Sequence, residues 1–268
     1  MVMAVVTTFP NVEEFEKATA CLDAKGLSCR VITPLPAYAR VGAPGLVVEE
    51  SVRAALCGEG AAPFVCSGWV DFRPADLIVP DESPKTYAED LFGYCAIMVL
   101  APCVADATKI RLVAHLSKDI GAVFPYLNTA MPNCSFNPHS SIVTFMESYR
   151  MMSLYAWRLT VAKADDLVDA WRVLEKIRCL VNDTWARRDS ISPSYELRKK
   201  PPALEIFKRL PGTNCRECGE RTCMAFAVRV WNGELTPTLC SPVFEGTHRH
   251  LKEPLLQICG GLGLAETA

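Results

Sequence analysis

The sequence predicts an α+β fold built from several modules, and three observations support this. The chain opens with the strand-like run MAVVTTF and a helix with a capping signal. Its middle holds several strand-like runs followed by one long amphipathic helix, and its last part carries four closely spaced cysteines. A length of 268 residues favours two or three domains. We expect domains at 1–80, 81–190 and 204–268, with a linker at 191–203.

The first 60 residues read as strand, helix, strand and a further helix. Asn11 followed by Glu14 resembles a helix capping box, and Gly26 is placed to end that helix. SCRVITPLP reads as the second strand, and GLVVEESVRAAL as either a brief strand and a helix or a direct helix start. This order predicts a ferredoxin-like βαβ unit.

The same layout resembles a family of Se/S carrier-like domains. In that family a cysteine–glycine pair follows the prolines of the second strand. The corresponding place in this chain reads Val41-Gly42-Ala43-Pro44 and has no cysteine. No carrier site is therefore transferred to these residues.

The next stretch is less regular. CSGWVDFRPADLIVPDESPK is rich in proline, glycine and aspartate, which predicts a loop-dominated connection. YCAIMVLAPC is apolar throughout, so its periodicity fits a buried strand and a core helix equally well.

A second unit follows, with the predicted order β-α-β-β-β-α. TKIRLVAHLS alternates as a strand, DIGAVFPYLNTAM reads as a short helix, and residues 140–164 as two or three antiparallel strands. A long helix is expected from Asp165 to about Arg188. This order resembles one half of the TATA-box-binding-protein fold. DNA binding in that fold uses a duplicated saddle with basic strands, and neither is visible here, so we expect no nucleic-acid partner.

Composition narrows the class further. A net charge of −2 gives no reason to expect nucleic acid or a polyanionic partner, and half of the residues are apolar, enough for a sizeable core. The N-terminus lacks the basic lead of a signal peptide, and we expect no membrane span. Thirteen cysteines without an export signal favour a reducing cytoplasm, as in an anaerobic cell.

The chemistry is concentrated in LPGTNCRECGERTCMAFA and the cysteine that follows it. Cys215, Cys218, Cys223 and Cys240 have the spacing C-x2-C-x4-C-x16-C. Four thiolates can complete a [4Fe–4S] cluster with one ligand per iron. A helix is expected to start at Cys223, where its dipole favours a negatively charged cluster.

Other uses of these cysteines remain open at this point. Four thiolates also suit a structural zinc ion, although zinc ribbons commonly have two C-x2-C knuckles and this chain has one. A redox-active C-x-x-C pair would need a βαβ context, and structural disulfides would need an oxidising compartment.

The motif resembles the small four-cysteine [4Fe–4S] domain of the corrinoid iron–sulfur protein large subunit. A similar module occurs in the ferredoxin-like subunit of the Rnf complex. The resemblance covers about residues 204–245 and implies that Cys215, Cys218, Cys223 and Cys240 are the cluster ligands. It implies an electron-transfer role and leaves the pathway open.

The linker that precedes the motif has more basic than acidic residues. The first interpretation is that it is a solvated linker stiffened by prolines, with no binding role. Its functional interpretation is a docking strip of Lys199, Lys200, Lys208 and Arg209 for an acidic redox partner of the ferredoxin or flavodoxin type.

Our leading hypothesis is a [4Fe–4S] protein for one-electron transfer that acts as an accessory or activating protein of an anaerobic metalloenzyme or corrinoid system. The alternative is a cysteine-based sulfur carrier or metallochaperone, and a third possibility is a zinc-stabilised interaction module. A second metal site could use Cys57, Cys66 and one of Cys95 or Cys103. No phosphate loop, G-x-S-x-G or H-E-x-x-H pattern is present, so no catalytic residue is assigned.

Overall fold

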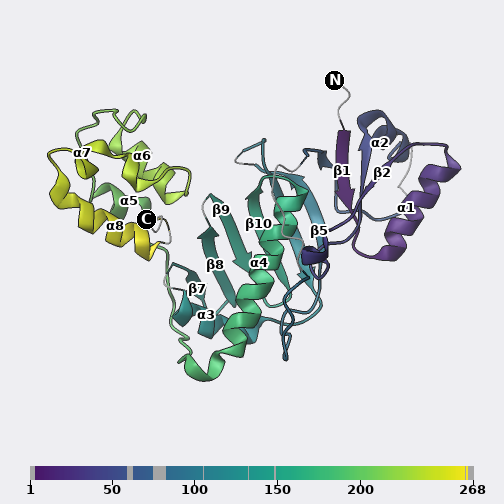
Figure 1. Ribbon diagram of the computed structural model, residues 1–268, viewed down its shortest axis with the longest axis horizontal. Helices are drawn as coiled ribbons and strands as arrows, with labels where there is room; N and C mark the ends of the chain where they lie inside the picture. Colours follow the sequence, from purple (N-terminus) through teal and green to yellow (C-terminus); the bar gives the residue numbers. More distant parts are fainter. Residues whose placement is uncertain are drawn as a thin grey trace. The chain divides into compact units, whose positions relative to one another are not determined.

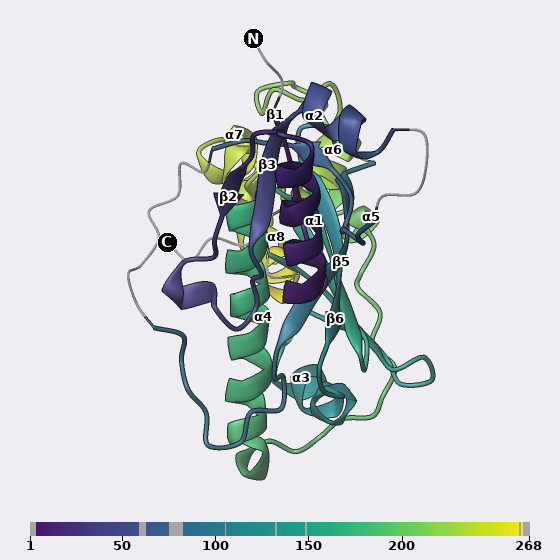
Figure 2. The same ribbon diagram turned by 90° about the vertical axis from the view of Figure 1, so that its right-hand side faces the viewer.

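The structure is a computed structural model of the whole chain, shown in Figures 1 and 2. It describes residues 4–58, 63–74, 83–104, 106–131, 133–147, 149–262 and 264. Helices and strands are both abundant, so the predicted α+β class is confirmed. Two compact units are distinguished, one comprising 1–123 with 154–187 and the other 124–153 with 188–268. The predicted four-part division of the chain stays a prediction.

A four-stranded sheet with the order β2-β3-β1-β4 occupies the beginning of the chain. Its strands are β1 (Ala4–Thr8), β2 (Arg30–Ile32), β3 (Gly45–Glu49) and β4 (Val70–Asp71). Strand β3 is antiparallel to both β1 and β2, which therefore run parallel to each other on its two sides. The predicted second strand is confirmed, and the residues before the second helix form a strand. The ferredoxin-like assignment itself stays a prediction.

Helix α1 (Val12–Ala24) begins as its sequence signal predicts. The Asn11 side chain accepts a hydrogen bond from the Glu14 backbone N–H at 2.9 Å, and Gly26 adopts a left-handed φ of 62° after the helix. Figure 2 shows α1 alongside the first sheet. Its buried Ala18 and Leu22 belong to a core cluster that also contains Leu46 of β3. Helix α2 (Glu50–Leu56) follows β3 directly.

A six-stranded sheet with the order β5-β6-β10-β9-β8-β7 follows. Its strands are β5 (Cys95–Pro102), β6 (Ile110–Leu116), β7 (Ser135–Asn137), β8 (Ile142–Glu147), β9 (Arg150–Leu154) and β10 (Arg158–Ala164). The ambiguous apolar run is thus strand β5, which pairs with β6 from Cys95 to Pro102 with a register shift between Ile97 and Val99. The short helix α3 (Phe124–Ala130) and the three strands β8–β10 are confirmed. Residues 75–82 of the expected loop lie outside the described residues, and the likeness to half a saddle stays a prediction.

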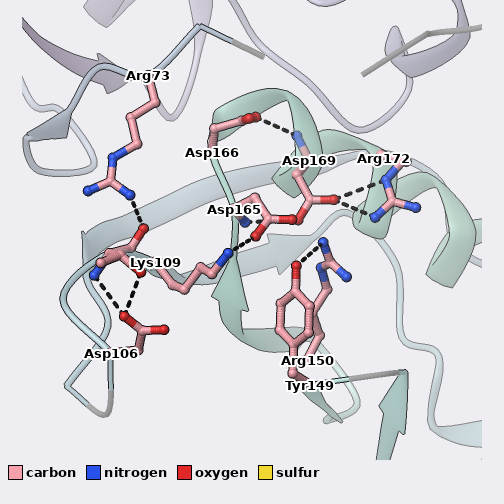
Figure 3. A network of polar contacts seen from close by, with 10 residues as sticks. Arg73, Asp106, Lys109, Tyr149, Arg150, Asp165, Asp166, Asp169 and Arg172 are labelled. Carbon is pink, nitrogen blue, oxygen red and sulfur yellow. Dashed lines mark hydrogen bonds and ion pairs between the residues drawn. The ribbon is translucent and has the colours of Figure 1, made fainter. Parts of the chain in front are cut away.

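The long helix α4 (Leu167–Ala186) packs on β10 and starts in a network of charged side chains (Figure 3). Asp166 caps it by accepting a hydrogen bond from the Asp169 N–H at 2.8 Å. The Asp169 carboxylate is fully buried, accepts from Arg172, and also accepts from the Asp165 backbone N–H at 2.9 Å. Asp165 in turn pairs with Lys109. Every one of these contacts fixes the helix start, so we interpret the network as structural.

Four short helices at the end of the chain, labelled α5 to α8 in Figure 1, form what we call the helical module, residues 203–261. Their buried side chains make a hydrophobic core of their own. The helices are α5 (Ala203–Phe207), α6 (Cys223–Trp231), α7 (Ser241–Phe244) and α8 (Lys252–Gly261). Phe226 and Val230 of α6 pack with Leu255 of α8, and all three side chains are buried. The predicted stop of the helix is confirmed by Gly233, whose φ is 72°.

The segment before α5 is held at both ends by hydrogen bonds. Arg198 forms a β-bridge with Phe136 and donates to the Met131 carbonyl at 2.9 Å. Asn128 of α3 donates to the Ser194 carbonyl at 3.0 Å. This part of the predicted linker therefore lies along α3 and β7 rather than being solvated on all sides.

Candidate metal centre

The four motif cysteines border one cavity in the helical module. Cys215 and Cys218 come from the loop before α6, Cys223 is the first residue of α6, and Cys240 immediately precedes α7. Phe226 and the prolines at 211 and 242 contribute apolar wall to the same cavity. The structure therefore gathers side chains that are up to 25 positions apart in the sequence, as the difference between 240 and 215 gives.

The loop between α5 and α6 contains four residues whose backbone adopts the left-handed conformation, with positive φ. Gly212 and Gly219 have φ values of 71° and 84°, which glycine adopts without strain. Asn214 and Arg216 have φ values of 52° and 68°, and they flank Cys215. Left-handed residues in a tight loop turn backbone N–H groups toward a common centre, an arrangement that favours anions. The cysteine spacing by itself predicted no role for Asn214 and Arg216.

Asn214 also fixes the start of helix α6. Its side-chain oxygen accepts a hydrogen bond from the Cys223 N–H at 2.8 Å, and the Thr222 hydroxyl accepts from the Ala225 N–H at 3.0 Å. These bonds satisfy two of the free N–H groups at the helix start and hold Cys223 in place. The signal that could have identified Asn214 is its position directly before the first cysteine in a Gly-Thr-Asn-Cys turn.

The four thiols differ in exposure. Cys215 is exposed, Cys218 is half-buried, and Cys223 and Cys240 are buried parts of the helical core. Burial raises the pKa of Cys240 to about 11, and the charges of the other three cysteines act in the same direction. At neutral pH the metal-free site therefore keeps Cys240 protonated, so metal binding must release a proton here.

Within the described parts of the chain, no three Cys, His, Asp or Glu side chains come close enough together to hold a single metal ion. The possible second site of Cys57, Cys66 and Cys95 or Cys103 is not found as such a group among the described residues. Cys57, which follows α2, is exposed, Cys66 and Cys95 are half-buried, and Cys103 is buried. Among the cysteines outside the motif, Cys29 and Cys57 are the exposed ones in the described residues. Burial raises the pKa of Cys29, which makes its thiol less reactive at neutral pH.

The residues of the predicted docking strip are largely engaged within the module itself. Lys208 and Arg209 both pair with Glu205, at 2.7 and 3.0 Å. Lys200 donates to the Trp231 carbonyl at 3.0 Å and its ammonium lies 3.8 Å from the centre of the Trp231 ring. Lys199 is exposed. The strip therefore presents less positive charge than its sequence suggests.

Comparison with known proteins identifies the same segment. Residues 210–242, which include all four cysteines, match the family described as "Putative Fe-S cluster". The chain is 55% identical over 40 residues to the acetyl-CoA decarbonylase/synthase complex subunit gamma 2 of Methanosarcina thermophila, covering 15% of this chain and 8% of that protein. It is 36% identical over 64 residues to the corrinoid/iron-sulfur protein large subunit of Moorella thermoacetica, covering 22% and 14%.

A third relative gives the same result. The subunit gamma of the acetyl-CoA decarbonylase/synthase complex of Methanocaldococcus jannaschii is 42% identical over 59 residues, covering 20% of this chain and 12% of that protein. The chain thus spans at most 14% of the length of these three relatives. No solved structure matches the chain. The resemblance to the corrinoid iron–sulfur domain is confirmed, and it is limited to the cysteine-containing segment.

Proposed function

We propose that this protein binds one [4Fe–4S] cluster through Cys215, Cys218, Cys223 and Cys240 and passes single electrons through it. The observation that carries the proposal is that all four cysteines border one cavity of the helical module. The match of residues 210–242 to an iron–sulfur family supports the same ligand set. When bound, such a cluster would accept and release one electron at a time.

The sequence spacing of the four cysteines supports a cluster over a zinc ion, because zinc ribbons commonly have two C-x2-C knuckles and this chain has one. A tetrahedral zinc ion binds sulfur at about 2.3 Å, so its four ligands must lie in mutual contact. In a [4Fe–4S] cluster each thiolate binds a different iron, and the sulfurs stand farther apart around a larger group. The four cysteines border one common cavity, which places them around a single shared site.

The difference in exposure between the ligands suggests where electrons pass. Cys223 and Cys240 are shielded by the helical core, whereas Cys215 is exposed. Cys215 also borders an open groove with Glu217, Glu245 and His248. We therefore assign the Cys215 side as the face toward the redox partner, because electron transfer is fastest where the least protein separates donor and acceptor.

The relatives suggest the setting in which this happens. Two of them are named as subunits of the acetyl-CoA decarbonylase/synthase complex and one as a corrinoid/iron-sulfur protein. We propose an accessory or activating role toward an anaerobic metalloenzyme or corrinoid system, with a ferredoxin- or flavodoxin-type protein as electron donor. The structure has no helix long and apolar enough to cross a membrane among its described residues.

The test is anaerobic purification followed by iron, acid-labile sulfide and zinc analysis. We expect about four irons and four sulfides per chain, and an electron paramagnetic resonance signal after reduction. A colourless protein with one zinc per chain that resists reconstitution with iron and sulfide would contradict the proposal. That result would favour the zinc-stabilised interaction module instead.

A further inference from the structure

A second cavity, distant from the cysteine motif in sequence, lies within the unit formed by residues 1–123 and 154–187. Its volume of about 390 Å³ falls in the range of small-molecule sites. Four cationic side chains border it, together with two tyrosines and a single carboxylate, Asp90. The cations are Arg40, Lys85, Lys118 and Arg178.

Two of the four cations are already neutralised by carboxylates. Arg178 is 1% exposed and binds Glu175 through two hydrogen bonds of 2.8 and 2.7 Å. Lys85 pairs with Asp183 at 2.5 Å. Both carboxylates come from helix α4, and the Arg178–Glu175 pair lies within that helix. The loop at residues 85–94 is attached to α4 by the Lys85–Asp183 pair and by a hydrogen bond of 2.7 Å from Arg178 to the Lys85 carbonyl.

Arg40 and Lys118 contact neutral groups instead. Arg40 donates to the Tyr94 hydroxyl at 2.5 Å, and its guanidinium carbon lies 4.8 Å from the centre of the Tyr94 ring. Lys118 donates to the backbone carbonyl of Asp90 at 2.6 Å. Neither contact cancels a positive charge, so both side chains can still attract an anion into the cavity.

The single carboxylate of the lining is turned toward protein donors. One oxygen of Asp90 accepts from the Gly93 N–H and from the side-chain amide of Asn182, both at 2.9 Å. Asn182 is fully buried, and its own oxygen accepts from the Leu91 N–H at 2.8 Å. These hydrogen bonds fix the loop at residues 85–94 before any ligand binds, and they stabilise the negative charge of Asp90.

We propose that this cavity binds a small organic or inorganic polyanion carrying phosphate or carboxylate groups, with Arg40 and Lys118 as its charged contacts. An oxyanion placed between a guanidinium and an ammonium replaces their neutral partners with charge-assisted hydrogen bonds. The site shares no residue with the cysteine cavity, so it does not depend on the function proposed above.

The experiment is isothermal titration calorimetry of the full-length protein at low ionic strength. Pyrophosphate represents phosphate ligands and citrate represents carboxylate ligands, so the stronger binder identifies the source of the anionic groups. The test variants are Arg40→Gln and Lys118→Gln. Each should weaken binding about tenfold or more, as expected for loss of one charge-assisted contact. Added salt should weaken binding further.

Two matched variants control for net charge. Lys25 is exposed and donates to a backbone carbonyl, that of Ala55, as Lys118 does to that of Asp90. Arg111 is an exposed arginine outside the lining. Lys25→Gln and Arg111→Gln should leave the affinity within about twofold, since they remove the same charge elsewhere. Circular dichroism verifies that all four variants are folded.

The proposal is overturned if neither anion binds saturably to the folded wild-type protein. It is equally overturned if the control variants weaken binding as much as the cavity variants, because that would indicate nonspecific attraction. Saturable binding that is lost only in Arg40→Gln and Lys118→Gln would support it.

Discussion

The sheet-containing part of the chain and the helical module both bury cysteines, but in different surroundings. The Cys95 thiol of β5 donates a hydrogen bond to the Val41 carbonyl at 3.5 Å, and burial raises the pKa of this thiol. Cys95 is half-buried, and Cys103, just after β5, is buried. Each of these thiols is one apolar side chain among others, and free cysteine commonly behaves in this way.

In the helical module, Cys223 and Cys240 are core residues and at the same time border a cavity with two further cysteines. Four thiols around one space are stable together only while protonated or while bound to metal, because four thiolates repel one another. The comparison teaches that burial alone says little about a cysteine. What matters is whether several thiols share one cavity.

The largest expected effect comes from removing, one at a time, two buried cysteines of the same helical core. Cys223→Ala should reduce the iron content from about four per chain to nearly none, because it removes a ligand of the proposed cluster. Cys259→Ala is the matched control, since Cys259 is fully buried in the same helical core and lies outside the cavity lining. Iron and sulfide analysis of both variants is the measurement.

Cys259→Ala should keep its iron and lose only packing energy, about 1–2 kcal/mol. Hydrogen exchange should show that Cys223→Ala loosens α5–α8 while the first sheet keeps its protection. Equal iron loss in both variants would show that any disturbance of this core releases the metal.

The second prediction concerns a buried residue of the other unit, whose loss should affect stability and leave the metal content unchanged. Asn182→Ala should lower the free energy of unfolding of the unit formed by residues 1–123 and 154–187 by about 2–4 kcal/mol, because it leaves the half-buried Leu91 N–H and the buried Phe92 N–H without their acceptor. Urea unfolding followed by circular dichroism measures this. The iron content should remain unchanged.

Asn11→Ala is the reference variant against which the loss of unfolding free energy in Asn182→Ala is compared. Asn11 caps the exposed start of α1, and its loss should cost only about 1 kcal/mol. If Asn182→Ala were no more destabilising than Asn11→Ala, the loop at residues 85–94 would not depend on Asn182 for its rigidity.

The third prediction concerns the contact of Lys200 with Trp231. Burial lowers the pKa of Lys200 to about 8 from its usual 10.5. Between these two values the unfolded chain binds more protons than the folded chain, so the free energy of unfolding should rise with pH in this window. Below pH 8 the full penalty of burying the charge is present, and the Trp231 carbonyl and ring partly offset it.

Lys200→Met should abolish this rise, because the methionine side chain carries no titrating group. Urea unfolding at several pH values between 7.5 and 10.5 measures the slope, and Lys199→Met, at an exposed neighbour, is the control. Parallel curves for wild type and Lys200→Met would mean that Lys200 keeps its charge throughout the window.

The smallest expected effect concerns the predicted docking strip. Lys199→Glu should slow electron exchange with an acidic ferredoxin a few-fold at low salt, and the effect should fade as ions screen exposed charges over about 8 Å. Lys208→Glu should slow it less, because Lys208 is already paired with Glu205. Stopped-flow reduction of the reconstituted protein measures both rates. Equal rates for wild type and Lys199→Glu would reduce the strip to a structural connection.

Features that depend on residues close together in the sequence could be predicted from the sequence by itself. The capping pair Asn11 and Glu14, the end of α6 at Gly233 and the extent of α4 depend on contacts between residues a few positions apart. The cysteine spacing likewise indicated an iron–sulfur domain, because ligand type and loop length are local properties. That indication agrees with the family match at residues 210–242.

Features that depend on distant partners were decided only by the tertiary structure. The apolar run at 95–102 became a strand because β6 supplies its hydrogen-bond partners, which no local period could reveal. Glu205 pairs with Lys208 and Trp231 contacts Lys200, although composition suggested that these basic side chains were exposed. The cation-lined cavity joins Arg40, Lys118 and Arg178 from three separate stretches of chain. Local preferences are set by neighbours in sequence, whereas pairing, charge neutralisation and cavities arise when remote segments meet and exclude water.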